Sequence, residues 1–349
     1  MIGGSVGLAA RERLGATVRG YDPVEGVLQA ASERAAVDVG CDSIAEAVDG
    51  ADTAVIASPV ATLPATIAEA LDAAAHDCVV TDVGSTKRAI VASCGDERFV
   101  GGHPLAGAET AGVQHARADL FEAATWYLTP TESTSGLLYE RLHRTIAGLG
   151  AQPAAIDAAD HDRVLAAVSH LPHVLANVLV GQAGEALAGG ADRLTATGPS
   201  FRDATRVAGA NSGIWTDIYL SNADALTDRI DDAIARLRDV RALLRAGDRG
   251  AVTAWNDAAA ADRRGLLEAG LAGGTVHELR VSVPNRPGVV AQVALELGRA
   301  GVNIVDMALH PAADMTEGVI ALWVAGDGEA DRAADLIGGL DLPVARAAG

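Results

Sequence analysis

The sequence has only one lysine, and basic residues as a whole are scarce. Lys87 is the single lysine among 349 residues, and 46 acidic residues against 27 basic ones give a net charge of −19. Nucleic acids and anionic membrane surfaces are bound through clustered cationic side chains, so neither is an expected partner. An anionic substrate would have to be held by individual arginines and histidines against an unfavourable overall field.

Cysteines and long apolar runs are also scarce. Cys41, Cys78 and Cys94 are odd in number and form no CxxC pair, which argues against a disulfide framework and a zinc site, so no metal is expected. No uninterrupted apolar run approaches the length of a membrane span, and the amino terminus lacks the basic and hydrophobic regions of a signal peptide. We expect a cytoplasmic protein with two or three domains, whose cores are built from the 49% of residues that are hydrophobic.

The amino terminus carries the second half of a dinucleotide-binding fingerprint. Gly3, Gly4 and Ser5 precede a helix-like segment at 8–14, and the short strand after it ends at Asp22. In the complete motif, a strand delivers Gly-x-Gly-x-x-Gly into a helix that holds the pyrophosphate, and an acid about 20 residues later binds the adenosine ribose. The first strand and the first two glycines are not in the sequence. We expect a translation start assigned too far downstream; the alternatives are a domain that has lost its cofactor loop and a flexible glycine-rich tail.

Short apolar strands alternate with helical segments over residues 52–156. Strands are predicted at 52–57, 78–83, 125–129 and 152–156, and helices at 63–74, 87–94 and 136–149. This alternation predicts a doubly wound parallel sheet, in which ligands bind at the carboxyl ends of the strands. The polar turns at two such ends contain Ser58 with Pro59 and Gly84 with Ser85, which are therefore candidate cofactor contacts.

A histidine and a carboxylate stand in residues 101–110, which read Gly-Gly-His-Pro-Leu-Ala-Gly-Ala-Glu-Thr. We predict a glycine-rich loop after a short strand at 99–100, because glycines let a backbone approach a ligand and the proline keeps His103 extended. Histidine is the natural proton acceptor at neutral pH, and Glu109 lies on the same predicted loop. The alternative is a histidine that caps a turn.

Residues 158–273 are rich in alanine and have helical spacing with little strand signal, which predicts an all-helical domain. His170 and His173 flank Leu-Pro, and the proline falls in the first turn of an apolar helix that runs to Leu187. Two histidines at this spacing could ligate a metal. No carboxylate or thiol stands at a matching spacing, so helix capping or hydrogen bonding to substrate is favoured. The mixed charges of residues 217–245 suit a dimer face or a solvated one.

The last segment repeats a pattern of strands and helices. Strands are predicted at 276–283, 302–307, 318–324 and 342–345, and helices at 289–300 and 329–337. This is the βαββαβ order of a ferredoxin-like unit.

In these motifs the chain resembles the prephenate dehydrogenase family of tyrosine biosynthesis over nearly its whole length. The motifs occur in the family's order: Asp82-Val83-Gly84-Ser85, Gly102-His103-Pro104 with Gly107-x-Glu109, Ser169-His170-Leu171-Pro172-His173, Phe201-Arg202-Asp203-x-x-Arg206, and Trp215. The last segment, with Asn285-Arg286-Pro287-Gly288 and Gly301-Val302-Asn303-Ile304, is similar to an ACT domain, an amino-acid-sensing module that some members carry. The resemblance implies an NAD-binding Rossmann-like domain at 1–156, a helical substrate and dimerisation domain at 157–274, and an ACT domain at 275–349.

The resemblance also implies catalytic roles. His103 would accept the proton of the substrate's ring hydroxyl while hydride leaves the same carbon for NAD, and carbon dioxide is lost as the ring becomes aromatic. Ser85 would orient the imidazole and Arg206 would hold the substrate's carboxylates. For Arg206 alone, the alternative is a surface salt bridge. The other implied substrate residues are His173 and Trp215 lining the pocket, His170 adding a hydrogen bond, and Glu109 and Asp203 pairing with Arg206 at the entrance.

NAD is the implied cofactor, because a carboxylate at Asp22 would repel the 2′-phosphate of NADP. Restoring an upstream strand that ends in Gly-x-Gly is expected to rescue NAD binding. The resemblance further implies a homodimer, and an effector such as tyrosine or another aromatic amino acid bound near Pro287, Gly288 and Asn303. The alternative for this last unit is a purely structural dimerising module.

Three other functions compete with prephenate dehydrogenation. Arogenate dehydrogenases perform the same chemistry on a substrate that bears an ammonium group and a carboxylate in place of the ketoacid. General β-hydroxyacid dehydrogenases use a lysine in their helical domain, and this chain has none there. A catalytically impaired amino-acid sensor would keep the ACT-like unit, but it would not need Ser85, His103 and Arg206.

Overall fold

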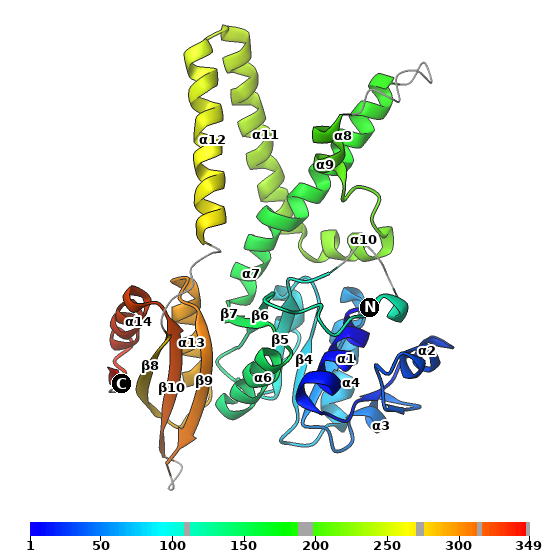
Figure 1. Cartoon of the computed structure of the whole chain (residues 1–349), viewed down its shortest axis with the longest axis vertical. Coiled ribbons are helices and arrows are strands. Elements are labelled where there is room, and N and C mark those ends of the chain that lie inside the picture. Colours follow the sequence, from blue (N-terminus) through cyan, green and yellow to red (C-terminus); the bar gives the residue numbers. More distant parts are fainter. Residues whose placement is uncertain (108–111, 188–197, 270–275, 313–315, 347–349) are drawn as a thin grey trace. The chain divides into compact units, whose positions relative to one another are not determined.

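The structure is a computed structural model that describes residues 1–107, 112–187, 198–269, 276–312 and 316–346 (Figure 1). The chain forms two compact units. The first unit comprises Met1–Asp162, Ala210–Ser221 and Val276–Gly349, and the second comprises Arg163–Gly209 and Asn222–Thr275. The first unit therefore contains both the α/β part of the chain and the ferredoxin-like part.

A five-stranded sheet forms the centre of the α/β part, in the order β3-β4-β5-β6-β7. Its strands are β3 (Thr53–Ile56), β4 (Val79–Asp82), β5 (Phe99–Pro104), β6 (Thr125–Thr129) and β7 (Gln152–Ala155). Neighbouring strands are parallel except β5 and β6, which are antiparallel, so the predicted parallel sheet is in fact mixed. The described part of the connection from β5 to β6 contains only the short 3₁₀ turn η2 (Val113–His115), not the crossover helix that usually joins parallel neighbours.

The strands β1 (Arg19–Gly20) and β2 (Val39–Gly40) form a separate two-stranded parallel sheet. Helix α1 (Ile2–Leu14) precedes β1, α2 (Val27–Glu33) lies between the two strands, and α3 (Ile44–Val48) leads to β3. Within the described residues, no strand joins β1 to β3. This is the position of the central strand in the doubly wound order, and the sequence contains only the part of the fingerprint that follows that strand.

Helices cover both faces of the five-stranded sheet. Leu63 and Ile67 of α4 (Leu63–Ala73) pack against Val80 on one face. Leu142 of α6 (Gly136–Gly148) packs with α1 and Val79 in a second core. Every residue of β4 is buried, as is expected of a parallel strand covered on both sides. The short helix α5 (Arg88–Ala92) follows β4.

The second unit is helical, as predicted. Helix α7 (Ala158–Leu165) enters it through a π-helical turn at Ala166–His170 and continues into α8 (Leu171–Leu187), with Pro172 in the first turn of α8. A π turn accommodates a proline downstream, because proline cannot donate the usual backbone hydrogen bond. The unit also contains α9 (Pro199–Thr205), α11 (Ala223–Ala246) and α12 (Arg249–Ala269), whereas α10 (Ser212–Ser221) belongs to the first unit.

By length and composition alone, the helical run Ala158–Ala186 could cross a membrane. Two buried histidines stand in it, and they bond to polar partners of the same unit. His170 Nδ1 lies 3.1 Å from the Asn222 amide, and His173 Nδ1 lies 3.4 Å from the Asn177 amide. Each buried histidine thus has a hydrogen-bond partner, as buried polar groups in proteins generally do.

The carboxyl-terminal part has the predicted βαββαβ order. Its sheet, β11-β8-β10-β9, is antiparallel throughout. The elements are β8 (Val276–Pro284), α13 (Val289–Arg299), β9 (Ile304–Pro311), β10 (Glu317–Ala325), α14 (Asp327–Gly338) and β11 (Val344–Arg346). Helix α13 contacts β7, and α6 contacts β9, so the α/β and ferredoxin-like parts share one hydrophobic core.

Candidate active site

His103 lies on strand β5 and is buried, with 8% of its surface exposed. The prediction of a glycine-rich loop is therefore wrong for residues 101–104, because these residues belong to strand β5 and pair with β6. The glycines serve close packing here. A β-carbon at Gly102 would lie 2.6 Å from the carbonyl oxygen of Asp82, and one at Gly101 would lie 2.4 Å from Thr129 Oγ1. Glu109 lies outside the described residues.

The imidazole of His103 is hydrogen-bonded to a second histidine. His103 Nδ1 lies 2.9 Å from Nε2 of His161, and the rings meet edge to face. On its other side, Nδ1 of His161 lies 2.8 Å from Oδ1 of Asp162. His161 and Asp162 are both almost fully buried, and burial lowers the pKa of His161. The three side chains form a buried chain, in the order His103–His161–Asp162.

Asp162 is held in place by the segment that follows β4. Its carboxylate accepts the backbone N–H groups of Lys87 at 2.7 Å and Arg88 at 3.0 Å, at the start of α5. The ammonium of Lys87 is fully buried in an ion pair with Asp82, and burial lowers its pKa. Asp82 also accepts the N–H of Gly102, the residue before His103. The one lysine of the chain is thus a structural ion that links β4, α5 and β5.

The turn after β4 holds Gly84 and the half-buried Ser85. A β-carbon at Gly84 would lie 2.5 Å from Leu63 Cδ1, so the turn has no room for a side chain there. No hydrogen bond joins Ser85 to His103 in the described part of the chain, and the ring is held by His161 instead. Ser85 lies at the carboxyl ends of the strands, and its role in orienting the imidazole stays a prediction.

Helix α10 packs at the carboxyl ends of β3 and β4. Ser221 on α10 donates to Thr86 Oγ1 at 3.0 Å, and α10 also contacts η1 (Val60–Thr62), the turn that directly follows Pro59. The half-buried Trp215 lies on this helix, with its ring 5.5 Å from that of Tyr219. Trp215, His103 and Ser85 are therefore in one compact unit, although the sequence predicted Trp215 to belong to the helical domain.

The remaining predicted substrate residues lie in the second unit. His173 is buried near the end of α9, where it interacts with the backbone of Val207, the neighbour of Arg206. Burial lowers the pKa of His173. Arg206 and Asp203 are exposed, and the backbone N–H of Arg206 bonds to the carbonyl of Asp203 as α9 ends. His170 is bonded to Asn222 and is one turn away from His173.

The predicted cofactor residues of α1 are packed closely. A β-carbon at Gly3 would lie 3.0 Å from that of Ala57, and one at Gly4 would lie 2.9 Å from Val113 Cγ2. The hydroxyl of Ser5 accepts the N–H of Arg117, so Ser5 anchors α1. These contacts fit the use of glycines in a nucleotide-binding turn, where small residues let a helix and a strand approach.

Two polar side chains lie at the ends of strands where a dinucleotide would bind. Asp22 follows β1 and accepts the N–H of Val24 at 2.9 Å, which turns the chain. Ser58 follows β3, next to Pro59, and its hydroxyl is buried without a hydrogen-bond partner in the described structure. A buried hydroxyl without a partner is costly, and a ligand at this edge would satisfy it. The residues present therefore fit a nucleotide at the carboxyl ends of the strands.

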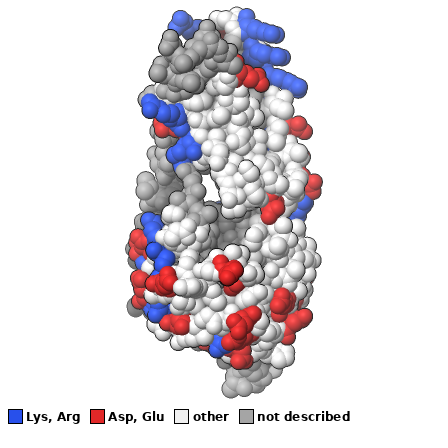
Figure 2. Space-filling view, turned by 90° about the vertical axis from the view of Figure 1, so that its right-hand side faces the viewer, with Lys and Arg blue, Asp and Glu red and all other residues white. Residues whose placement is uncertain are grey.

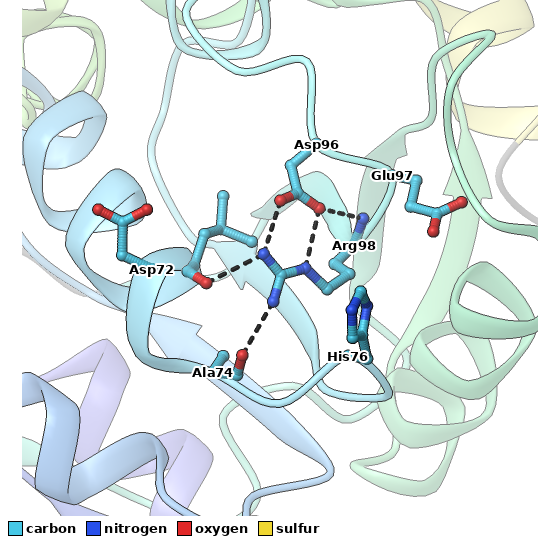
Figure 3. A pocket seen from close by; sticks show the side chains of 7 residues that line it. Asp72, Ala74, His76, Asp96, Glu97 and Arg98 are labelled. Carbon is cyan, nitrogen blue, oxygen red and sulfur yellow. Dashed lines mark hydrogen bonds and ion pairs between the residues drawn. The ribbon is translucent and has the colours of Figure 1, made fainter.

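A cavity of about 450 Å³ lies between the end of α4 and the segment that leads into β5 (Figure 3). Arg98, just before β5, binds Asp96 through Nε at 3.0 Å and Nη2 at 2.7 Å. The same guanidinium bonds to the carbonyls of Leu71 and Ala74 at the end of α4. It is therefore engaged in holding the end of that helix, and the hydrogen bonds from Arg98 lower the pKa of Asp96. This cavity is structural and is not the candidate site.

The predicted effector residues are not brought together within one chain. Gly288 precedes α13, and its N–H donates to the carbonyl of Thr134 in the α/β part. Asn303 follows the other end of α13 and is exposed. An 11-residue helix is roughly 16 Å long, and Gly288 and Asn303 flank opposite ends of it.

Sequence reasoning missed His161, Asp162 and Asp82 with its partner Lys87. The predicted boundary at residue 156 assigned His161 and Asp162 to the helical domain, whereas the first compact unit extends to Asp162. One signal was available. A histidine stands between two aspartates, in Asp160-His161-Asp162, directly after the last strand of the α/β part.

Comparison with known proteins agrees with this architecture. Three protein-family models match the chain: "Prephenate dehydrogenase, nucleotide-binding domain" at residues 6–154, "Prephenate dehydrogenase, dimerization domain" at 157–255, and "ACT domain" at 277–335. The prephenate dehydrogenase of Bacillus subtilis is 32% identical, over 97% of this chain and 93% of its own length.

Two solved structures are also similar. Prephenate dehydrogenase from Aquifex aeolicus, in complex with hydroxyphenyl propionate and NAD+, is 28% identical with a TM-score of 0.72, over 76% of this chain and 94% of that one. Arogenate dehydrogenase from Synechocystis is 27% identical with a TM-score of 0.66, over 76% of this chain and 96% of that one. With its three family domains in order and a relative that matches along nearly the full length, this chain belongs to the prephenate dehydrogenase family.

Proposed function

We propose that the chain catalyses the NAD-dependent oxidative decarboxylation of prephenate to 4-hydroxyphenylpyruvate in tyrosine biosynthesis, in the cytoplasm. The observation that carries this proposal is His103, buried at the carboxyl end of β5 and held through Nδ1, so that Nε2 is the ring nitrogen placed to take a proton. The family, and the prephenate dehydrogenase of Bacillus subtilis at 32% identity, support the choice of substrate.

The reaction needs one group that moves a proton and cationic groups that hold two carboxylates. His103 would take the proton of the ring hydroxyl as the carbonyl forms and hydride leaves the same carbon. NAD, when bound, supplies the acceptor for that hydride. Breaking the bond to the carboxylate releases carbon dioxide and returns an electron pair to the ring, and His103 then gives its proton back to the phenolate oxygen. Atoms and charge balance with no net release of a proton.

Four residues would bind the substrate. Arg206, with its planar guanidinium, would pair with a substrate carboxylate, and His173 beside Val207 would lie near the same end. Trp215 would line the ring's binding site. Glu109 and Asp203 are proposed to pair with Arg206 at the entrance, and His170 to add a hydrogen bond.

The proposed NAD contacts lie around the carboxyl ends of the strands. Ser58, with its buried unpartnered hydroxyl, and the adjacent Pro59 would contact the cofactor, together with Gly84 and Ser85 in the turn after β4. Gly3, Gly4 and Ser5 at the start of α1 would lie near the pyrophosphate. Asp22 favours NAD over NADP, because its carboxylate would repel a 2′-phosphate.

Steady-state kinetics with prephenate and NAD test the proposal. His103→Gln keeps a polar side chain but cannot accept a proton, so kcat should fall by about a hundredfold or more. The exposed His115 offers a matched control, because His115→Gln should leave kcat unchanged. A wild-type protein without turnover that still binds tyrosine would favour the amino-acid sensor instead.

Arogenate is the alternative substrate, and the similarity to the Synechocystis arogenate dehydrogenase is the observation in its favour. The two substrates share the reacting ring, so His103 would act identically on either. Assays of both substrates, each with NAD and with NADP, separate the two activities. A kcat/KM that is higher for arogenate would replace prephenate in the proposal.

A homodimer is proposed from the second unit. Helix α11 has 24 residues, of which only Leu226 is buried in the single chain, and it exposes Ile234, Leu237 and Leu244 along one stripe. On α8, Val178 and Leu179 are also exposed. On the face drawn in Figure 2, acidic side chains gather in the lower half and basic side chains stand at the top. A long helix with so little buried surface needs a partner, and the matched dimerisation-domain model suggests a second copy.

An aromatic amino acid, with tyrosine as the first choice, is the proposed effector of the ACT part. A cavity of about 180 Å³ lies beside Pro287 and Arg286, between them and Ser135 of the α/β part. Because Asn303 lies at the other end of α13, it would share a site with Gly288 only across two copies of the chain. Titration of tyrosine in the kinetic assay tests the proposal, and flat rates across the millimolar range would contradict it.

A further inference from the structure

We propose that His161, itself held by Asp162, is a positioning residue that fixes the tautomer of His103 and stabilises the imidazolium that His103 becomes during the reaction. This inference rests on the proposed function, in which His103 is the proton acceptor. It is carried by the two hydrogen bonds of the His103–His161–Asp162 chain, which are 2.9 and 2.8 Å long.

The direction of both hydrogen bonds follows from Asp162, the last side chain in this series. A carboxylate can only accept, so Nδ1 of His161 must carry the hydrogen that it shares with Asp162. In a neutral imidazole the other nitrogen then has a lone pair, so Nε2 of His161 accepts. Nδ1 of His103 must therefore be the donor, and the lone pair of His103 lies on Nε2. This is the nitrogen that must be unprotonated to take the proton of the substrate.

The surroundings keep His161 neutral in the resting state. It is fully buried, and burial lowers its pKa. The charged groups around it are Asp162 on its own helix, and Lys87 with Asp82 from β4 and the segment that follows. Tyr127 of β6 meets its ring edge to face at 5.7 Å. No group in this set competes with Asp162 for the Nδ1 hydrogen.

The same surroundings stabilise a proton that arrives on His103. The buried set contains two carboxylates, Asp82 and Asp162, and one ammonium, Lys87, so it carries one net negative charge while both imidazoles are neutral. When the O–H bond of the substrate breaks and Nε2 of His103 takes the proton, the set becomes neutral. The imidazolium then donates its Nδ1–H to His161, whose own Nδ1–H points to Asp162. The proton later returns to the phenolate oxygen, so the chain is restored.

A pair of substitutions at His161 separates positioning from simple packing. His161→Leu removes both hydrogen bonds, so kcat should fall by about a hundredfold with little change in KM. Because nothing then accepts the Nδ1–H, the imidazolium is less stable and the acid limb of the kcat profile should move to lower pH. His161→Gln keeps an acceptor toward His103 and a donor toward Asp162, so it should recover most of the lost rate.

His143 provides the matched control, because it is a buried histidine on α6 outside this network. His143→Leu should leave kcat and its acid limb in place. A His161→Leu variant with wild-type kcat and an unshifted acid limb would overturn the proposal, as would a His161→Gln variant no better than His161→Leu.

A spectroscopic measurement tests the tautomer without turnover. Nitrogen-15 NMR of the wild-type protein should show His103 protonated on Nδ1 and unprotonated on Nε2, and His161→Leu should lose this preference. A wild-type His103 protonated on Nε2 would overturn the inference whatever the kinetics show. If neither prephenate nor arogenate is turned over but the Nδ1–H tautomer is present, the proposed function fails, and with it the stabilisation of the imidazolium; only the role of His161 in fixing the tautomer then stands.

Discussion

Gly298 on α13 lies directly against the backbone of Ala155 in β7, so closely that a β-carbon at position 298 would lie 2.0 Å from the Ala155 carbonyl oxygen. Both residues belong to the first compact unit, and this contact joins its ferredoxin-like part to its α/β part. The close approach therefore explains a glycine near the end of a helix, where alanine would otherwise be preferred.

Gly298→Ala should therefore destabilise the protein, although alanine is the better helix former. We expect a loss of about 1–3 kcal/mol in the free energy of unfolding, because backbone atoms cannot move aside as a flexible side chain can. Gly338 on α14 is the control, since a β-carbon there would meet nothing within 4 Å. Thermal denaturation should show a lower Tm for Gly298→Ala and an equal or higher Tm for Gly338→Ala. Equal Tm values would contradict the contact.

The buried His143 makes stability depend on pH in a defined window. Neither of its ring nitrogens has a hydrogen-bond partner in the described structure, and burial lowers its pKa from 6.5 to about 4. Between these values the unfolded chain binds a proton that the folded chain does not, so stability is full above pH 6.5 and falls as the pH drops toward 4. This one group accounts for about 3 kcal/mol across that window.

His143→Leu should remove this dependence and raise stability, because it replaces an unsatisfied buried polar group with an apolar one of similar size. Urea denaturation of both proteins at several pH values measures the effect. The difference between them should widen as the pH falls from 6.5 to 4. A difference that stays constant with pH would show that His143 is not buried in its neutral form.

Local patterns predicted most of the elements but not the chemistry between them. The alternation of strands and helices gave the layers, and the turns after β3 and β4 placed Ser58 and Ser85 at the carboxyl edge of the sheet. His103 was found because a histidine between glycines and a proline stands out. Its environment was misjudged, since the same glycines permit close strand packing as readily as they form a loop.

The partners of His103 could not be predicted because they depend on contacts between distant segments. His161 is 58 positions away from His103 in the sequence, and Asp162 meets Lys87 across 75 positions. The position of Trp215 in the first unit could not be predicted for the same reason. Helical spacing shows that α10 is a helix, but not that it packs on the turn at Thr86 in the first unit.

The exposed stripe on α11 predicts a dimer that charge can disrupt. Leu237→Glu combined with Leu244→Glu should give a monomer, because two carboxylates would be buried without partners in the interface. Arg238→Glu with Arg245→Glu is the control, with the same spacing on neighbouring exposed positions and a larger change in charge. Sedimentation velocity measures the state of each. A control that dissociates as readily would indicate charge repulsion, and a leucine variant that stays dimeric would exclude this stripe from the interface.

Strands β1 and β3 lie in separate sheets, and this predicts that an added strand between them will change the affinity for NAD. Extending the amino terminus by an apolar strand that ends in Gly-x-Gly should place that strand between β1 and β3, where the described residues contain none. Calorimetry should then show tighter NAD binding than that of the chain without the extension, because the glycines let the backbone reach the pyrophosphate at the start of α1. The control has the same strand with valines in place of the two glycines. It should raise Tm by pairing both sheets, yet leave NAD binding weak. If the chain without the extension binds NAD as tightly as the extended one, the two sheets do not need a shared strand to form the site.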